Sequence, residues 1–170
     1  MVKRFVGVSK HIKRKRGIMN IRGIQSIFSR YKGLILIIYL MFLLSLTLFN
    51  RSVGDEYRMK LTPFWSYREV FVENNKDLIG QMVCNILVFL PWSLLLAFNF
   101  PSMRKFFCSI GSALFFSLFI EIIQLVSKCG LFEFDDIFHN TLGATIGYVI
   151  YVFIKAKYHH QGIAKRDHHD

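Results

Sequence analysis

The side chain of Glu121 is the first place in this sequence where chemistry is expected. Glu121 and Gln124 lie in an otherwise apolar run from Phe106 to Ser127, which is long enough to cross a bilayer. An ionisable group inside such a run is energetically costly and usually has a partner or a function. Its carboxylate could bind a cationic group of a ligand, or transfer a proton as an acid or base. We therefore take Glu121 as a candidate catalytic residue.

A second group of polar residues follows a short acidic loop. It begins with Asp135 and Asp136, and residues spaced from there at i, i+4, i+7 and i+11 would share one face of a helix. The residues with this spacing are Asp136, Asn140, Gly143 and Gly147. Asp136 is thus a second catalytic candidate, with Asp135 as an alternative partner of Glu121. The two glycines predict a surface for close helix packing, because they let another backbone approach.

Another apolar run, residues 78–98, carries a polar pair near its start. Gln81 and Asn85 are spaced at i and i+4, so they share a helix face. Pro91 lies in the middle of the run and leaves the carbonyl of Leu87 without its usual donor. We therefore expect a kink in this helix at Pro91.

The composition fits a small helical membrane protein that would position these side chains. Of the 170 residues, 53% are hydrophobic and 18 are phenylalanines, which is too apolar for a small soluble domain. The apolar runs predict four helices of about 20 residues, each able to cross a core of about 30 Å. They are expected at residues 33–49, 78–98, 106–127 and 136–154. The predicted fold class is all-α: a polytopic integral membrane bundle with four transmembrane helices and both termini cytoplasmic.

The basic residues predict the orientation and the division of the chain. Ten of the 22 lysines and arginines lie in residues 1–32, and sixteen fall on the side of the termini if the chain crosses four times. Such an excess is typical of the cytoplasmic side of a cell membrane. We divide the chain into a basic cytoplasmic arm (1–32), a four-helix transmembrane domain (33–155) and a charged, disordered cytoplasmic tail (156–170). The arm is expected to contact anionic lipid rather than nucleic acid, and Met19 offers a second start within it.

This topology brings polar residues of different helices to a common depth near the outer face of the bilayer. The candidate ligand-binding cluster comprises Asn85, Glu121, Gln124, Asp135, Asp136 and Asn140. In neighbouring helices, such carboxylates and carboxamides can share hydrogen bonds or a proton. A structural alternative stays open, in which Glu121 is bonded to Gln124 and Asn140 and only holds the third and fourth helices together.

Neither a metal nor a cofactor is indicated by the remaining cysteines and histidines. The three cysteines are odd in number and lack a CxxC spacing, so we interpret them as packing residues: Cys84, Cys108 and Cys129. Four histidines lie in the charged tail, which does not favour a specific metal site: His159, His160, His168 and His169. We expect His139 to face the lipid headgroups, with a proton relay as its alternative role.

The loop of residues 50–79 contains an aromatic segment around Pro63, Phe64 and Trp65. Aromatic side chains of this kind are typical of the headgroup level of a membrane. The segment is expected either to form part of an aromatic belt or to take part in binding.

Four short motifs, taken in order, resemble the VanZ-like family of membrane proteins. They are Leu61-x-Pro63-Phe64, Asn85-Ile-Leu-Val-Phe89-Leu-Pro91, Ser117-Leu-x-x-Glu121-x-x-Gln124 and Asp135-Asp136-x-x-x-Asn140-x-x-Gly143-x-x-x-Gly147. The chain departs from the family pattern at Thr62, at Trp92-Ser93 and at Gly130, where many members carry an arginine. The resemblance covers most of residues 34–154. It implies a protein of the bacterial cell envelope with a role in tolerance of glycopeptide antibiotics of the teicoplanin type.

Three functions are compatible with these observations. The favoured hypothesis is a non-enzymatic protein of the bacterial cytoplasmic membrane whose outward-facing polar pocket binds a lipid-linked cell-wall precursor or a glycopeptide antibiotic. The second is an intramembrane enzyme acting on a lipid-linked envelope substrate, although the sequence lacks the nucleophile and phosphate-binding motifs considered. The third is a proton-coupled transporter of small solutes, which would have to form a homo-oligomer because four helices are few.

Overall fold

The computed structural model describes residues 30–49 and 55–166. The chain divides into two compact units. Unit 1 comprises Met1–Ile38, of which the described residues are helical. Unit 2, Tyr39–Asp170, contains the rest of this first helix and all the other elements. Most of the basic arm predicted for residues 1–32 lies outside the described residues.

The predicted helical membrane fold is confirmed. Among the described residues, four helices are long and apolar enough to cross a membrane, and their candidate spans are Arg30–Leu48, Asp77–Asn99, Phe106–Val126 and Phe134–Lys157. The first ends in a π-helical turn, η1 (Ser45–Phe49), and the next two are α3 (Asp77–Asn99) and α4 (Phe106–Val126), joined through the 3₁₀ turn η2 (Pro101–Arg104). The last is α5, Phe134–Arg166. The sequence placed the end of this helix at Ile154 and a disordered tail beyond it, whereas α5 continues as far as Arg166.

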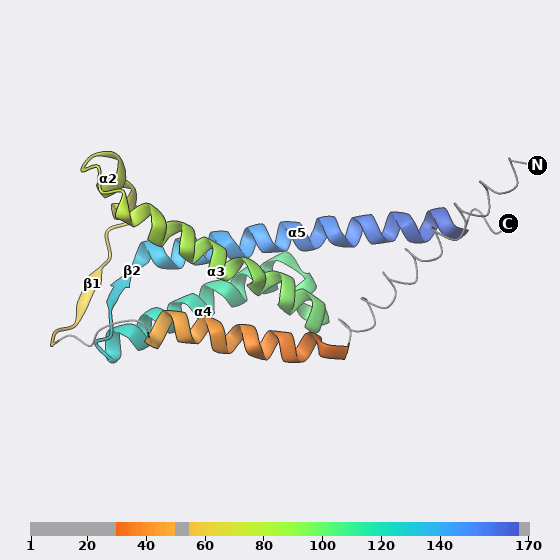
Figure 1. Cartoon of the computed structure of the whole chain (residues 1–170), viewed down its shortest axis with the longest axis horizontal. Coiled ribbons are helices and arrows are strands. Elements are labelled where there is room, and N and C mark those ends of the chain that lie inside the picture. The colour runs from red at the N-terminus through yellow and green to blue at the C-terminus, as the bar shows by residue number, and fades with distance from the viewer. Residues whose placement is uncertain (1–29, 50–54, 167–170) are drawn as a thin grey trace, which may run out of the picture. The chain divides into compact units, whose positions relative to one another are not determined.

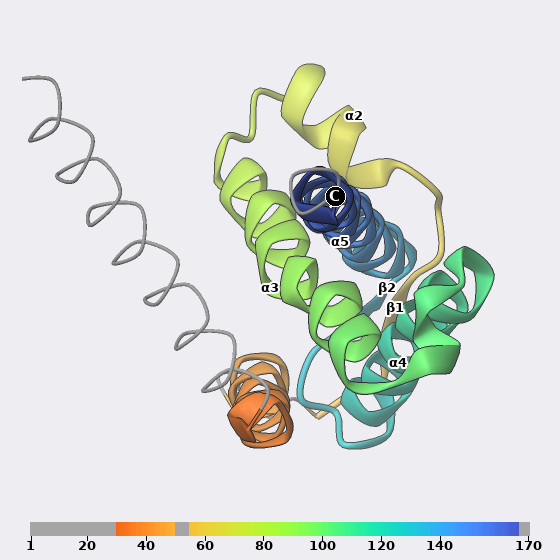
Figure 2. The ribbon, with the colours of Figure 1, turned by 90° about the vertical axis from the view of Figure 1, so that its right-hand side faces the viewer.

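Helix α5 packs beside both α3 and α4 (Figures 1 and 2). Its two glycines meet the backbone of α3. A Cβ added to Gly143 would overlap the carbonyl oxygen of Ile86, and one added to Gly147 would overlap that of Leu90. Since only glycine leaves room for these oxygens, the two positions fix how closely α3 and α5 approach. Helix α3 itself continues through Pro91.

The distribution of side chains is that of a protein surrounded by lipid. Large apolar residues are exposed on the helices, such as Phe107, Phe115 and Phe153. Carboxylates, amides and hydroxyls are buried instead, as described below. The cysteines follow the exposed pattern in part: Cys84 and Cys108 are exposed and Cys129 is half-buried. Their interpretation as packing residues is therefore wrong for Cys84 and Cys108.

The loop between the first helix and α3 is folded, which the sequence analysis did not predict. It contains strand β1 (Arg58–Lys60) and helix α2 (Trp65–Phe71). Strand β1 pairs in parallel with β2 (Leu131–Glu133), which joins α4 to α5. We call residues 57–72, with β1 and α2, the cap. We call the region where α3 begins, α4 ends and α5 begins the polar end (Figure 1).

Candidate functional site

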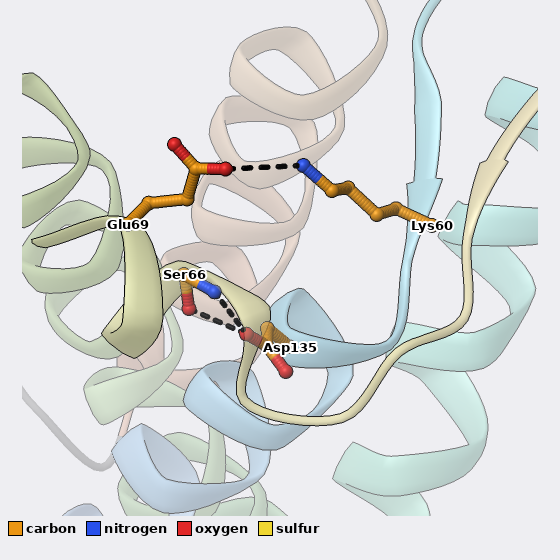
Figure 3. Close-up of polar contacts among 4 residues, drawn as sticks. All are labelled: Lys60, Ser66, Glu69 and Asp135. Carbon is orange, nitrogen blue, oxygen red and sulfur yellow. Dashed lines mark hydrogen bonds and ion pairs between the residues drawn. The ribbon is translucent and has the colours of Figure 1, made fainter. Parts of the chain in front are cut away.

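Asp135 fastens the cap to the first turn of α5. One carboxylate oxygen accepts the backbone N–H of Phe64 at 2.6 Å. The other accepts the backbone N–H of Ser66 at 2.9 Å and its hydroxyl at 2.5 Å (Figure 3). Helix α2 has no side-chain cap of its own, because its N-cap position is occupied by Phe64. Asp135 therefore serves as the N-terminal cap of α2 from a distant part of the chain.

The backbone at Phe64, directly before α2, has an unusual conformation. Phe64 has a φ of 58°, in the left-handed region that a bulky residue rarely adopts. This conformation turns the N–H groups of Phe64 and Ser66 toward the same carboxylate. The side chain of Asp135 is almost completely buried. Because three donors already hold its two oxygens, Asp135 is better suited to anchor the cap than to act as the acid or base partner of Glu121.

Lys60 makes a second set of contacts inside the cap. Its Nζ lies 3.5 Å from the centre of the Trp65 ring. The same atom lies 3.8 Å from a carboxylate oxygen of Glu69 (Figure 3). A cation over an indole face and near a carboxylate is stabilised by both. Lys60 thus connects β1 to α2.

Asp136 and Asn85 meet at the polar end, from α5 and α3 respectively. The Nδ2 of Asn85 donates to Oδ1 of Asp136 at 2.7 Å. Asp136 is buried, and an amide donor offsets part of the penalty for removing its carboxylate from water. The two residues therefore bridge the helices that the glycines hold together farther along.

Glu121 binds the strand that leads into α5. Its Oε2 accepts the backbone N–H of Glu133, in β2, at 2.9 Å. The side chain is 2% exposed. Glu121 therefore holds β2 beside the end of α4. The structural alternative in which Glu121 is bonded to Gln124 and Asn140 stays a prediction.

The amides of Gln124 and Asn140 connect further elements. Gln124 donates to the backbone carbonyl of Thr47, in the π-helical turn, at 2.7 Å, while its own Oε1 is buried and has no partner among the described residues. Asn140 donates to the hydroxyl of Ser117 at 2.8 Å, linking α5 to α4. Ser117, Glu121 and Gln124 follow each other at i, i+4 and i+7, so one face of α4 supplies all three.

His139 is buried, and the expectation that it faces the headgroups is wrong. It is 1% exposed, and its Nε2 lies 3.1 Å from the hydroxyl of Tyr67 in α2. Its other nitrogen, Nδ1, is buried without a partner among the described residues. Burial and, secondarily, the carboxylate of Asp135 raise the pKa of Tyr67, so the phenol stays protonated. The cap covers His139, which the helix pattern alone could not reveal.

The six residues of the predicted cluster all lie in α3, α4 and α5 at the polar end, where their hydrogen bonds bridge different elements. Three of their partners were not proposed from the sequence: Thr47, Ser66 and Glu133. A fourth partner, Ser117, stands in one of the four motifs. In the part of the chain that the structure describes, no group of three or more histidines, cysteines or acids could hold a metal ion. The bridges can support hydrogen bonding to a ligand through the unpartnered atoms of Gln124 and His139.

Comparison with known proteins places this arrangement in a family. The sequence model of the VanZ/LLP1 family matches residues 35–155. The chain is 29% identical over 124 residues to Protein VanZ of Enterococcus faecium, covering 69% of this chain and 71% of that protein. No solved structure matches the chain. The matched residues include all four membrane helices nearly complete, the cap and the polar end, and the chain belongs to the VanZ/LLP1 family.

Proposed function

We propose that this protein resides in the bacterial cytoplasmic membrane and contributes to tolerance of glycopeptide antibiotics of the teicoplanin type. Its polar end would face outward and bind a lipid-linked cell-wall precursor or the antibiotic itself. The observation that carries this proposal is the gathering of buried polar side chains from four segments, α2, α4, β2 and α5, at one end of a VanZ-family membrane domain. Ionisable and polar side chains buried at membrane depth often mark functional sites, also where they are hydrogen-bonded to one another.

Two atoms at the polar end support binding rather than structure alone. The Oε1 of Gln124 and the Nδ1 of His139 are buried, and neither has a partner among the described residues. A buried polar atom without a hydrogen bond is unfavourable by about 1–3 kcal/mol, so a ligand group or a water at these positions would be stabilising. Hydroxyl, amide and amine groups of envelope precursors and glycopeptides could supply the partner of Gln124.

The charge distribution supports the outward orientation. The loop of residues 50–79 and the loop after α4 contain only six of the 22 lysines and arginines. Since the polar end lies at these loops, an excess of basic residues on the opposite side favours its position outside the cell.

A complementation experiment tests the proposal. A strain that lacks this gene would carry the parent protein, Gln124→Leu or a matched control, Ser109→Ala, and its growth would be measured in teicoplanin and in unrelated envelope-targeting antibiotics. Ser109 is the matched position because its hydroxyl is also buried and unpartnered, but near the start of α4. We expect Gln124→Leu to lose tolerance of teicoplanin, compared at equal amounts of protein, while Ser109→Ala keeps it; abundance is measured by immunoblot because Gln124→Leu also removes the hydrogen bond to Thr47. Equal tolerance in deletion and parent strains would contradict the proposal.

A further inference from the structure

The cap exposes large apolar side chains. On β1, alternate residues point to opposite sides, so Tyr57, Met59 and Leu61 share one side, and Arg58 and Lys60 lie on the other. The three apolar side chains are exposed, Met59 by 58%, whereas the ammonium group of Lys60 lies over the Trp65 ring and its side chain is 39% exposed. A strand that covers a protein in water shows the reverse arrangement, with its charges outward.

Helix α2 and its two flanking residues also expose apolar side chains. Ser66 is buried, whereas Phe71 in the helix and Val72 after it are exposed by 81% and 74%, and Phe64 before it is exposed as well. Scattered exposed apolar side chains are common in soluble proteins, but a segment of 16 residues that turns six of them outward is not. The exposed side of the cap thus resembles the exposed side of the membrane helices.

The exposed apolar side chains belong to a segment that hydrogen bonds hold in place, and not to a flexible loop. Asp135 holds the start of α2 through both Phe64 and Ser66. The register of β1 with β2 sets the side of the strand on which each residue lies, from Arg58 opposite Leu131 to Lys60 opposite Glu133. The apolar side chains therefore cannot turn inward without breaking these contacts.

The apolar side of the cap continues into the lipid-facing surface of α5. The ring of Phe64 packs edge-on against Phe138, with the ring centres 5.4 Å apart. Phe138 is exposed on a helix that is long and apolar enough to span the membrane. Arg58 and Arg68 are exposed in the same segment and have side chains long enough to reach lipid phosphates.

We infer that the cap lies within the membrane interface, with its apolar side chains among the lipid acyl chains, and is not an aqueous loop. The bilayer is thus the partner of this surface, and α2 acts as a short helix lying against the membrane. The polar end is consequently enclosed by lipid as well as by protein, and a ligand would reach it from within the bilayer rather than directly from water.

Thiol labelling in proteoliposomes tests this inference. In a background with Cys84, Cys108 and Cys129 replaced by Ser, single cysteines would be introduced as Met59→Cys and Phe71→Cys, with Asn75→Cys as the control. All three positions are exposed in the structure, but Asn75 lies beyond the cap. N-ethylmaleimide crosses membranes, so the orientation of the protein in the liposome does not affect the result. The reagent reacts with thiolates, which do not form in lipid, so a cysteine within the bilayer is protected. We expect labelling at residues 59 and 71 to be about tenfold or more slower than at residue 75, and equal rates in denaturant.

Two outcomes would overturn the inference. Labelling of Met59→Cys and Phe71→Cys as fast as that of Asn75→Cys in liposomes would mean that the cap lies in water. Protection that disappears when the protein is diluted in lipid would mean that a second copy covers the cap.

A Phe71→Trp variant gives a second readout that retains an aromatic side chain. Compared with the parent, its additional fluorescence should be quenched by brominated lipid and not by aqueous iodide. The reverse would contradict the inference. Neither experiment involves an antibiotic, so their failure and that of the proposed function can be distinguished.

Discussion

The buried carboxylates of this protein differ in what holds them. Asp135 accepts two backbone N–H groups and a hydroxyl, Glu121 accepts a backbone N–H, and Asp136 accepts a side-chain amide. An amide oxygen can replace a carboxylate oxygen that accepts one hydrogen bond. It cannot replace two oxygens that both accept, because the NH₂ group of the amide would face a donor. Asp135 is therefore expected to tolerate isosteric substitution by asparagine poorly.

Asp135→Asn is expected to weaken the attachment of the cap. The introduced NH₂ would face the N–H of either Phe64 or Ser66, leaving that donor unsatisfied at about 1–3 kcal/mol. We expect a lower midpoint of thermal unfolding in detergent and faster proteolysis within the cap. Asp136→Asn is the control, since the carbonyl oxygen of an asparagine can still accept from Asn85. An equal loss in both variants would mean that the capping of α2 does not distinguish Asp135.

Glu121→Gln separates a structural role from a chemical one. The introduced carboxamide can accept the N–H of Glu133, so we expect normal abundance. It has neither the charge nor the titratable proton, so we expect tolerance of teicoplanin to fall, and to a lesser extent in Asp136→Asn. Tolerance would be measured in the complemented deletion strain, with abundance by immunoblot. Full tolerance with both substitutions present would make the aromatic segment around Pro63, Phe64 and Trp65 the better candidate.

At the scale of elements, the long helices could be predicted and the cap could not. Apolar runs of about 20 residues identify membrane helices, and the spacing of Asp136, Asn140, Gly143 and Gly147 correctly indicated one helix. β1 and β2 have three residues each, too few for an alternating pattern to be recognised. Their pairing, like the capping of α2 by Asp135, joins residues that are far apart in the chain, and no local pattern specifies such partners.

The packing of α3 against α5 yields a prediction with an internal control. Gly143→Ala would place a methyl group against the backbone carbonyl of Ile86, and a backbone atom cannot move aside as a flexible side chain can. We expect a loss of stability of about 1–3 kcal/mol or more, and Gly143→Leu should also lower the amount of folded protein. Gly111→Ala, in α4, is the control because nothing lies within 4 Å of its added Cβ. Thermal unfolding in detergent would compare them, and equal midpoints would contradict close packing at Gly143.

At the scale of the whole molecule, the sequence predicts which side of the membrane the loops occupy, and this depends on charge rather than on packing. The positive-inside pattern predicts that residues 50–79 lie outside the cell. Asn75→Cys, in the cysteine-free background that includes Cys129→Ser, should react with an impermeant thiol reagent in intact cells. The measurement is the labelled fraction before and after lysis. Labelling only after lysis would put the polar end on the cytoplasmic side.

The parallel pairing of β1 with β2 has a consequence for biosynthesis. β1 and α2 leave the ribosome before α3 and α4, whereas β2 and Asp135 follow both of these helices. Strands from the two loops can meet once both helices have crossed the bilayer, whereas a single failed crossing leaves the loops on opposite sides. Until the strands meet, α2 lacks its N-terminal cap, and β1 is an unpaired edge. A closed cap therefore excludes the failure of a single crossing, and a chain in which one of the two helices has not inserted would carry an open cap that quality-control proteases could recognise.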